Sequence, residues 1–440
     1  MTQIKLRFWL LIFILPITAS AQDTLQTIEL PSVNDAIRFA KKKNPDLEIY
    51  RIQQEIARRE FRKSKNYILP HVSAGFSAQN NMNLPVTPLP GEIFGQPGET
   101  IDAQFGQDFA YNTGITTSKN VLDWQVKTAS KMANINRIMA VVQTELYQQQ
   151  LTEQVAVYYY STLVTREALA VAEEDANLAD SLVQLSQEKL EQGLIDQFAV
   201  NKALINANTI QQQIAANQLF LEQCENGLKQ LFGLNPSDQI YFSEPFTNPI
   251  IAPDLQPELT PDISLKLAEH EAQNAKFQLR YEQFSFLPRF SVSHYYGLQQ
   301  YRDSRGFSLE SGSWSDYSYV LFNLSIPVFQ GFSRNNSVKA AKLQREIADK
   351  KVAQKTRNAA LNDQLLVSSY QKSATTAHAA LQNFQLAEEN KNIAFQRYQE
   401  GLISLEDYLL IFDDYLNVES VYLNALADFY NYYATIISRS

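Results

Sequence analysis

The chain has 440 residues, a formal net charge of −9, 14 glycines, 16 prolines and one cysteine. The single cysteine, Cys224, excludes an intrachain disulfide and a structural metal site built from cysteines, and the acidic balance disfavours nucleic-acid binding. Glycine and proline are bunched into a few places, which leaves helical runs far longer than the usual dozen or so residues. The composition therefore favours a few long helices over two or three ordinary domains.

The start of the chain is typical of an export signal. Lys5 and Arg7 precede the apolar run at 8–15, and Ala19-Ser20-Ala21 provides a cleavage site of small residues. We predict a signal peptide at residues 1–21, whose removal changes the net charge to about −11 by the same count. No later segment is apolar enough for a transmembrane helix. The exported protein is therefore either soluble outside the inner membrane or inserted as β-structure.

After the signal, the sequence predicts two helices and then two strands. Ser32 caps a short helix that ends near Lys43, and Asn44-Pro45-Asp46 has the cap, proline and acid that open a second one. Strict alternation of apolar and polar residues predicts strands at about 70–79 and 108–120. The segment 80–107 between them carries four prolines and four glycines, so we expect a long exposed loop there.

A long helical hairpin follows at about 123–232. Gly193-Leu194-Ile195-Asp196 interrupts this helical run, because a glycine at the end of a helix is a stop signal. Six prolines between Pro236 and Pro261 then predict a linker at 236–260.

The same order of elements returns after the linker. Thr260-Pro261-Asp262 repeats the cap, proline and acid of the earlier helix start, and alternation predicts strands at about 288–299 and 316–328. A second hairpin at about 332–437 is interrupted at Gly401-Leu402-Ile403-Ser404. We therefore predict two structural repeats, 22–235 and 261–440, separated by the linker.

The last helix carries two apolar rows at heptad spacing, which is typical of a long helix that packs along other helices. One row consists of Leu409, Leu416, Leu423, Tyr430 and Ile437, and its neighbour consists of Tyr408, Tyr415, Tyr422, Phe429 and Ile436.

Four strands per chain are too few to close a barrel. A sheet in lipid has to be closed, because an open edge leaves backbone groups without partners. If these strands enter a membrane, several chains must therefore combine. Three chains give twelve strands, an even number within the range of outer-membrane barrels.

Several of these segments resemble the TolC family of outer-membrane efflux proteins. The resemblance covers about residues 30–437 and depends on the order and duplication of its segments. These are Leu69-Pro70, Leu287-Pro288, the segment 327–331 by which the chain leaves the fourth strand, and above all 397–408. It implies a homotrimer in which a twelve-stranded β-barrel in the outer membrane continues into an α-helical barrel in the periplasm. It also implies a passive exit duct of a tripartite efflux or type I secretion system, with a periplasmic adaptor protein and an inner-membrane pump as partners.

The resemblance also implies site residues. It assigns the adaptor-docking tips to Gly193, Leu194, Gly401 and Leu402, although helix capping alone also explains these turns. It assigns the pore entrance to Asp407, with Glu400 and Asp414 at heptad spacing from it, although a solvated helix face is an alternative for these acids. Where some members carry a second acid, this chain has Leu410.

Two other function classes remain open at this point. A periplasmic coiled-coil scaffold or adaptor that never enters lipid explains the heptads and the signal, but not the symmetric strands. An enzyme is a weaker hypothesis, because the four histidines are scattered and the sequence has no nucleotide-binding loop, no dinucleotide fingerprint and no nucleophile elbow. We therefore expect no catalytic residues, cofactor or metal.

Overall fold

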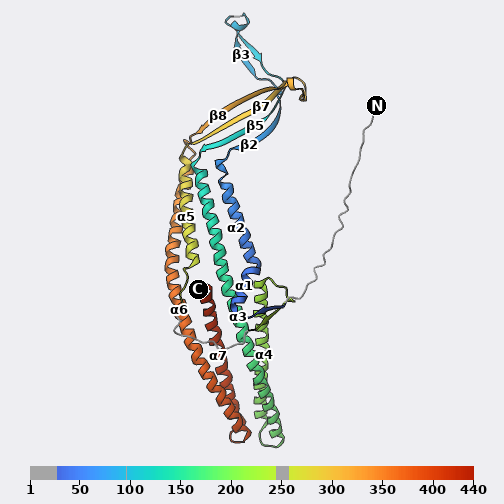
Figure 1. Ribbon diagram of the computed structural model, residues 1–440, viewed down its shortest axis with the longest axis vertical. Coiled ribbons are helices and arrows are strands. Elements are labelled where there is room, and N and C mark those ends of the chain that lie inside the picture. The colour runs from blue at the N-terminus through green and yellow to red at the C-terminus, as the bar shows by residue number, and fades with distance from the viewer. Residues whose placement is uncertain (1–26, 96, 244–256) are drawn as a thin grey trace, which may run out of the picture. The chain divides into compact units, whose positions relative to one another are not determined.

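The computed structural model describes residues 27–95, 97–243 and 257–440, and the predicted signal peptide lies outside these residues. The fold is mostly helical, with one larger sheet (Figure 1). The α-helices are α1 (Val33–Lys43), α2 (Pro45–Ser64), α3 (Trp124–Glu191), α4 (Gln197–Phe232), α5 (Ile263–Gln283), α6 (Ser333–Gln399) and α7 (Leu405–Arg439). The strands are β1 (Thr27–Leu30), β2 (His71–Asn80), β3 (Val86–Pro90), β4 (Thr100–Gln104), β5 (Phe109–Leu122), β6 (Gln239–Phe242), β7 (Arg289–Arg302) and β8 (Ser315–Ser325).

The chain forms two compact units, and α3, α6 and α7 contribute residues to both. One unit contains the larger sheet and comprises residues 44–154, 257–390 and 414–440; we call it the sheet unit. The other contains both helix–helix turns and comprises the described residues of 27–43, 155–249 and 391–413; we call it the turn unit. Each unit draws on both of the predicted sequence repeats.

The larger sheet has the strand order β2-β5-β7-β8 and is antiparallel throughout. Its strands lie within three residues of the ranges expected from alternation. The register aligns Val72, Thr117, His294 and Val320 across one face, and the neighbouring row aligns Ser73, Thr116, Tyr295 and Tyr319 across the other. Period-two alternation therefore separates a largely apolar face from a more polar one.

The helices that precede β2 and β7, α2 and α5, have different N-terminal caps. Asn44 caps α2 as expected, because its side chain accepts a hydrogen bond of 2.7 Å from the N–H of Leu47, with Pro45 at the first helical position. The expectation that Thr260 caps the matching helix was wrong. The cap of α5 is Asp262, whose carboxylate accepts a hydrogen bond of 2.7 Å from Ser264 N–H.

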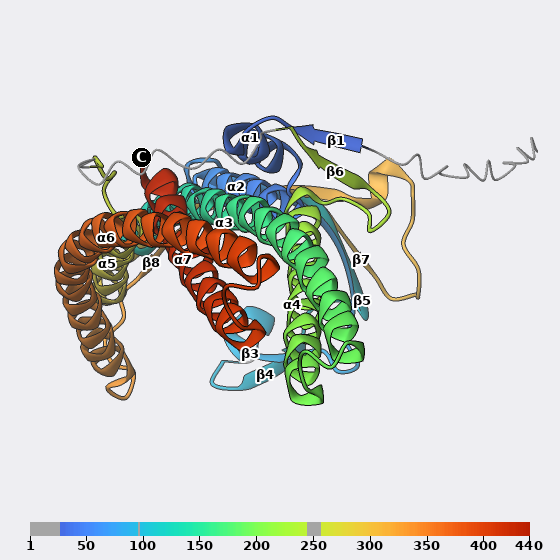
Figure 2. The ribbon, with the colours of Figure 1, turned by 90° about the horizontal axis from the view of Figure 1, so that it is seen from below.

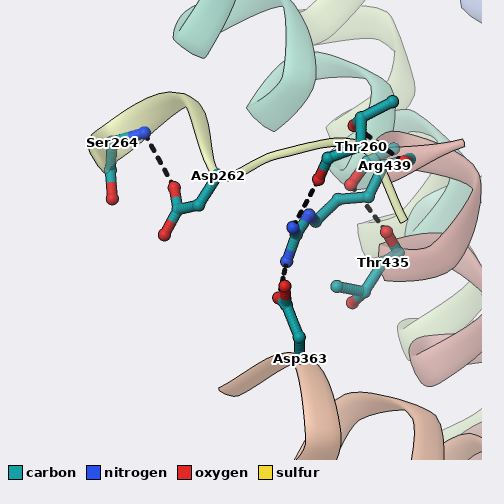
Figure 3. Close-up of polar contacts among 7 residues, drawn as sticks. Thr260, Asp262, Ser264, Asp363, Thr435 and Arg439 are labelled. Carbon is teal, nitrogen blue, oxygen red and sulfur yellow. Dashed lines mark hydrogen bonds and ion pairs between the residues drawn. The ribbon is translucent and has the colours of Figure 1, made fainter. Parts of the chain in front are cut away.

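Thr260 instead bonds to the last helix of the sheet unit (Figure 3). Its N–H and hydroxyl donate hydrogen bonds of 2.7 and 2.8 Å to the backbone oxygen of Arg439. The Arg439 guanidinium returns a hydrogen bond of 2.6 Å to the Thr260 oxygen and also contacts Asp363 of α6. These contacts join the end of α7 to α6 and to the segment before α5.

Within the sheet unit, α6 and α7 pack through aromatic side chains. Tyr415, Tyr422, Phe429 and Ile436 of the predicted heptad row are all buried, whereas Leu416 and Leu423 of the other row are half-buried. The ring of Phe384 on α6 stacks on Tyr422 at 5.3 Å between centroids, and Tyr370 contacts Phe429 at 5.6 Å. One heptad row therefore forms a seam within the chain.

The segment 80–107 is not the long loop that its prolines and glycines suggested. Val86–Pro90 and Thr100–Gln104 pair as the antiparallel hairpin β3–β4. Proline lacks an N–H donor and is tolerated at the edge of a sheet. In a two-stranded ribbon each strand has an open edge, which explains why Pro88 and Pro90 can lie within β3.

In the turn unit, α3 and α4 lie side by side (Figure 2). Arg166 of α3 forms a hydrogen-bonded ion pair of 2.8 Å with Glu225 of α4. At Gly227 of α4 an added Cβ would lie 2.7 Å from the ring of Tyr158, so the absent side chain allows the close approach. Tyr159 of α3 is also fully buried.

A small parallel pair, β1 and β6, also belongs to the turn unit and was not expected. The predicted linker at 236–260 lies partly outside the described residues, and its described beginning includes β6. Ile240 and Phe242 are buried, and the Phe242 ring contacts Tyr159 at 5.4 Å. The sequence did not predict β6, because alternation over four residues is too short a signal and the prolines around the strand indicated a linker.

Candidate functional site

The two helix–helix turns of the turn unit have the same backbone construction. Gly193 and Gly401 adopt left-handed φ angles of +72° and +75°, the region that glycine occupies without steric cost. The residue after each glycine donates a backbone hydrogen bond back into the preceding helix, Leu194 to Lys189 at 2.9 Å and Leu402 to Arg397 at 2.8 Å. Each turn is therefore a glycine-ended helix, as the sequence predicted, followed by a capped helix start.

The leucines of both turns are exposed to solvent. Leu194 is 66% exposed and Leu402 is 69% exposed, and no side chain lies within 4 Å of the position where a Cβ on Gly193 or Gly401 would be. Each turn therefore presents a leucine side chain to solvent.

Asp407 takes part in the cap of α7. Its N–H donates to Ser404 Oγ at 3.0 Å, and its carboxylate accepts hydrogen bonds of 2.7 Å from the Ser404 hydroxyl and 3.3 Å from the Ser404 N–H. This reciprocal pair is a capping box, in which serine and acid are three residues apart. This spacing is visible in the sequence, so the capping box, which was missed there, could have been predicted from it. Asp407 is nevertheless exposed, so its charge faces solvent.

Glu400 lies beside Gly401 at the same turn and is exposed. Neither Glu400 nor Asp407 forms an ion pair with any described residue. Asp414 is also exposed but belongs to the part of α7 in the sheet unit. The structure thus brings Glu400 and Asp407 to one turn of the turn unit and leaves Asp414 two helical turns further along α7.

Polar contacts between α4 and α7 lie next to these turns. Lys202 forms an ion pair of 3.1 Å with Glu406, and the Asn206 amide donates a hydrogen bond of 2.8 Å to Asp413. These contacts join residues more than 200 positions apart, so no local sequence signal predicts them. They fix the start of α7 against α4 within one chain.

A buried polar cluster lies between α3 and the helices that flank the second turn. Asp175 forms an ion pair of 3.0 Å with Lys391, and Lys189 Nζ lies 4.0 Å from the ring centroid of Tyr398. Burial, followed by the charge of Asp175, raises the pKa of Tyr408 above the usual value for tyrosine. The cluster is a structural feature of the turn unit that the sequence did not reveal.

The larger sheet of the sheet unit has an exposed apolar face. The exposed fraction is 59% for Val72, 50% for Ile115, 53% for Val320, 66% for Phe322 and 58% for Leu324. Among the described strands, β2 and β8 each have one partner in this sheet, so its outer edges are unpaired there. Such an apolar face is characteristic of surfaces that contact lipid or other proteins.

Other kinds of site find little support among the described residues. No group of three or more His, Cys, Asp or Glu side chains in this part of the chain is arranged to hold a metal ion. His71 and His294 lie in strands β2 and β7, as expected. None of the described helices combines the length and hydrophobicity that a membrane span requires.

The chain resembles solved outer-membrane channels over nearly all of its length. It matches the Campylobacter jejuni CmeC outer membrane channel with a TM-score of 0.76 and 17% identity, covering 92% of this chain and 84% of that one. The outer membrane protein VceC of Vibrio cholerae matches with a TM-score of 0.73 and 18% identity over 92% of this chain and 95% of that one. The open state of the Neisseria gonorrhoeae MtrE outer membrane channel gives a TM-score of 0.73 and 17% identity over 93% and 88% of the two chains. At such identities the likeness shows a shared fold.

Sequence comparison defines the family. No curated protein matches the chain. The model of the family described as outer membrane efflux protein matches residues 36–234 and 256–436, which together make up most of the sequence. The chain therefore belongs to the outer membrane efflux protein family.

Proposed function

We propose that three copies of this chain form a closed twelve-stranded β-barrel in the outer membrane, which continues into a helical barrel in the periplasm. The observation that carries this proposal is the four-stranded sheet with an exposed apolar face and two unpaired outer edges. In lipid, each unpaired backbone group costs several kcal/mol, so such a sheet requires closure by further copies. Strands of 10 to 14 residues are long enough to cross a bilayer when tilted.

The family gives the protein its general role as an outer-membrane efflux channel. We propose further that the duct is passive and that a periplasmic adaptor and an inner-membrane pump deliver the cargo. The two matched segments, 36–234 and 256–436, support a division into two structural repeats, each supplying two strands and one helical hairpin.

We assign adaptor docking to the two turns at Gly193-Leu194 and Gly401-Leu402. The exposed leucines support this, because each turn presents one large apolar side chain on a backbone that glycine and a cap hold in place. The test is site-specific cross-linking between the adaptor and the channel, comparing L194S/L402S with L219S, which alters another exposed leucine of the turn unit. Equal cross-linking yields from the two variants would contradict the assignment.

We assign the pore entrance to Asp407, Glu400 and Asp414. All three are exposed acids, and three copies around an axis would give rings of negative charge that attract cations. Because the capping box also explains Asp407, this assignment requires a variant that keeps the charge of Asp407 but removes the cap.

Membrane fractionation combined with planar-bilayer recording tests the proposed function. We expect the protein to remain in the outer-membrane fraction after a carbonate or urea wash and to form ion-conducting pores after purification. Release by the wash, without conductance, would instead support a periplasmic scaffold. That alternative leaves the exposed apolar face of the sheet without a function.

A further inference from the structure

Charge is unevenly distributed over the sheet unit. The helix end of the larger sheet comprises residues 61–71, 119–131, 276–289 and 325–340, and we call it the junction belt (Figure 1). These segments carry eleven Lys or Arg residues but only two Asp or Glu residues, in a chain whose net charge is −9. By contrast, the segments 79–108 and 302–316 at the other end of the sheet together carry seven acids and two Lys or Arg residues. The two ends of the sheet therefore have opposite charge.

Several cations of the junction belt lie over aromatic rings. Lys65 lies 4.4 Å from the ring centroid of Phe61, Lys127 lies 5.4 Å from that of Trp124, and Arg334 lies 6.0 Å from that of Phe286. Trp124 is 39% exposed and Phe286 is 45% exposed. Aromatic rings at the polar–apolar boundary, with long cationic side chains extending into the polar layer, are typical of protein surfaces at membrane interfaces.

The register connects the junction belt to the apolar face of the sheet. Lys119 pairs with Val292, which pairs with Phe322, so this lysine lies on the apolar face near its helix end. The next aligned row beyond the bulge in β5 consists of Leu122, Phe290 and Leu324. Trp124, the first residue of α3, lies two positions after Leu122 in the chain. The cations thus lie at the boundary of the surface that would contact lipid.

The cations are available for an external anion. Lys65, Lys119, Lys127 and Arg334 form no ion pair with the residues that the structure describes, and the first three of them are exposed. Lys63 differs, since it lies 3.5 Å from Glu60. Unpaired cations at a lipid boundary complement the phosphate of a lipid headgroup, which carries a fixed negative charge.

We propose that the junction belt binds the headgroups of acidic glycerophospholipids in the leaflet on the helix side of the membrane. This inference depends on the proposed insertion of the sheet into lipid and adds a lipid preference to it. Each Lys or Arg near an anionic membrane surface contributes about 1 kcal/mol, or about fivefold in affinity. The interaction weakens at high salt, because exposed charges are screened over about 10 Å at 0.1 M salt.

Spin-labelled lipids test the proposal with the complete protein. The purified protein is reconstituted into phosphatidylcholine vesicles that contain a trace of spin-labelled phosphatidylglycerol or spin-labelled phosphatidylcholine. Electron spin resonance then gives the relative association constant of the two lipids for the protein surface. We expect a preference of at least about threefold for phosphatidylglycerol in low salt, and a smaller preference in 1 M salt.

Two matched triple variants identify the surface responsible. K65Q/K127Q/R334Q removes three charges from the junction belt, and K351Q/K372Q/R357Q removes three exposed charges from α6 away from the belt. We expect the first variant to lose most of the preference and the second to keep it.

An equal association of both lipids with the wild-type protein would overturn the inference, as would an unchanged preference in the first variant. Both results would leave the membrane channel intact. If neither lipid were motionally restricted by the wild-type protein, the protein would not be in the bilayer, and the proposed function would fail together with the inference.

Discussion

Asp175 and Lys391 form an ion pair of 3.0 Å, although their side chains are only 1% and 8% exposed. Asp175 lies in the last third of α3 and Lys391 lies near the end of α6, so the pair joins the two helical hairpins within the turn unit. A buried ion pair is not in itself strong stabilisation, because removing two charges from water nearly offsets their attraction. Removing only one of the two residues is, however, destabilising, because the other charge then stays buried without a partner.

We predict that K391M lowers the free energy of unfolding by about 3–5 kcal/mol, because it leaves the carboxylate of Asp175 buried without its cation. The double variant D175L/K391M should recover most of this loss. Thermal unfolding in detergent, followed by circular dichroism, measures both variants. The control is K372M, which changes an exposed lysine of the same helix and should leave the unfolding midpoint within a degree or two. An unfolding midpoint of K391M equal to that of the control would show that the pair contributes nothing.

The two roles of Asp407 can be separated. D407A removes both the charge and half of the capping box, whereas S404A removes the hydroxyl of the cap and keeps the charge. We predict that D407A weakens the cation preference of the single channel and that S404A does not, although S404A should cost about 1 kcal/mol of stability through the lost cap. Reversal potentials in asymmetric salt measure the preference. Equal preference in the wild type and D407A would contradict a role at the pore entrance.

Gly114 and Tyr295 are tightly packed on the more polar face of the sheet. A Cβ at Gly114 would lie 2.5 Å from the hydroxyl oxygen of Tyr295 and 2.7 Å from the backbone oxygen of Tyr296. We therefore predict that G114A destabilises the sheet by about 1–3 kcal/mol through overpacking. Y295A/G114A should recover part of the loss, because it removes the ring but not the backbone oxygen. Unfolding in urea measures these differences, and a G114A variant as stable as wild type would show that the site has room for the methyl group.

Arg439 closes the contact between α7, Thr260 and Asp363 (Figure 3). We predict that R439M lowers stability by about 1–3 kcal/mol, because the Thr260 oxygen loses a charged donor. Amide hydrogen exchange at Thr260, whose N–H donates to the backbone of Arg439, should become faster. The control is R357M, an exposed arginine of α6, for which exchange at Thr260 should be unchanged. Equal exchange rates in the two variants would contradict the role of Arg439.

The features that were predicted correctly from the sequence depend mostly on neighbouring residues. Asn44 was identified as a cap because its hydrogen-bond partner is three residues away, and Gly193 and Gly401 were identified as turns because left-handed backbone favours glycine. The capping box of Ser404 and Asp407 is equally local, so its spacing was sufficient to predict it.

Features formed by distant residues could not be predicted in this way. Thr260 looked like a cap beside Pro261, but its partner Arg439 is 179 residues away. Asp175 and Lys391 are 216 residues apart. Strands β1 and β6 have four residues each, and Thr27 of β1 pairs with Gln239 of β6. Local pattern carries no information on which distant segment will be the partner, and strands this short give almost no periodic signal.

Electron cryomicroscopy of the full-length protein, extracted from outer membranes in detergent, can show whether three chains close one barrel. We predict a threefold-symmetric particle in which each chain contributes β2, β5, β7 and β8 to a closed ring of twelve strands. Single chains, or particles in which the edges of β2 and β8 remain unpaired, would contradict it.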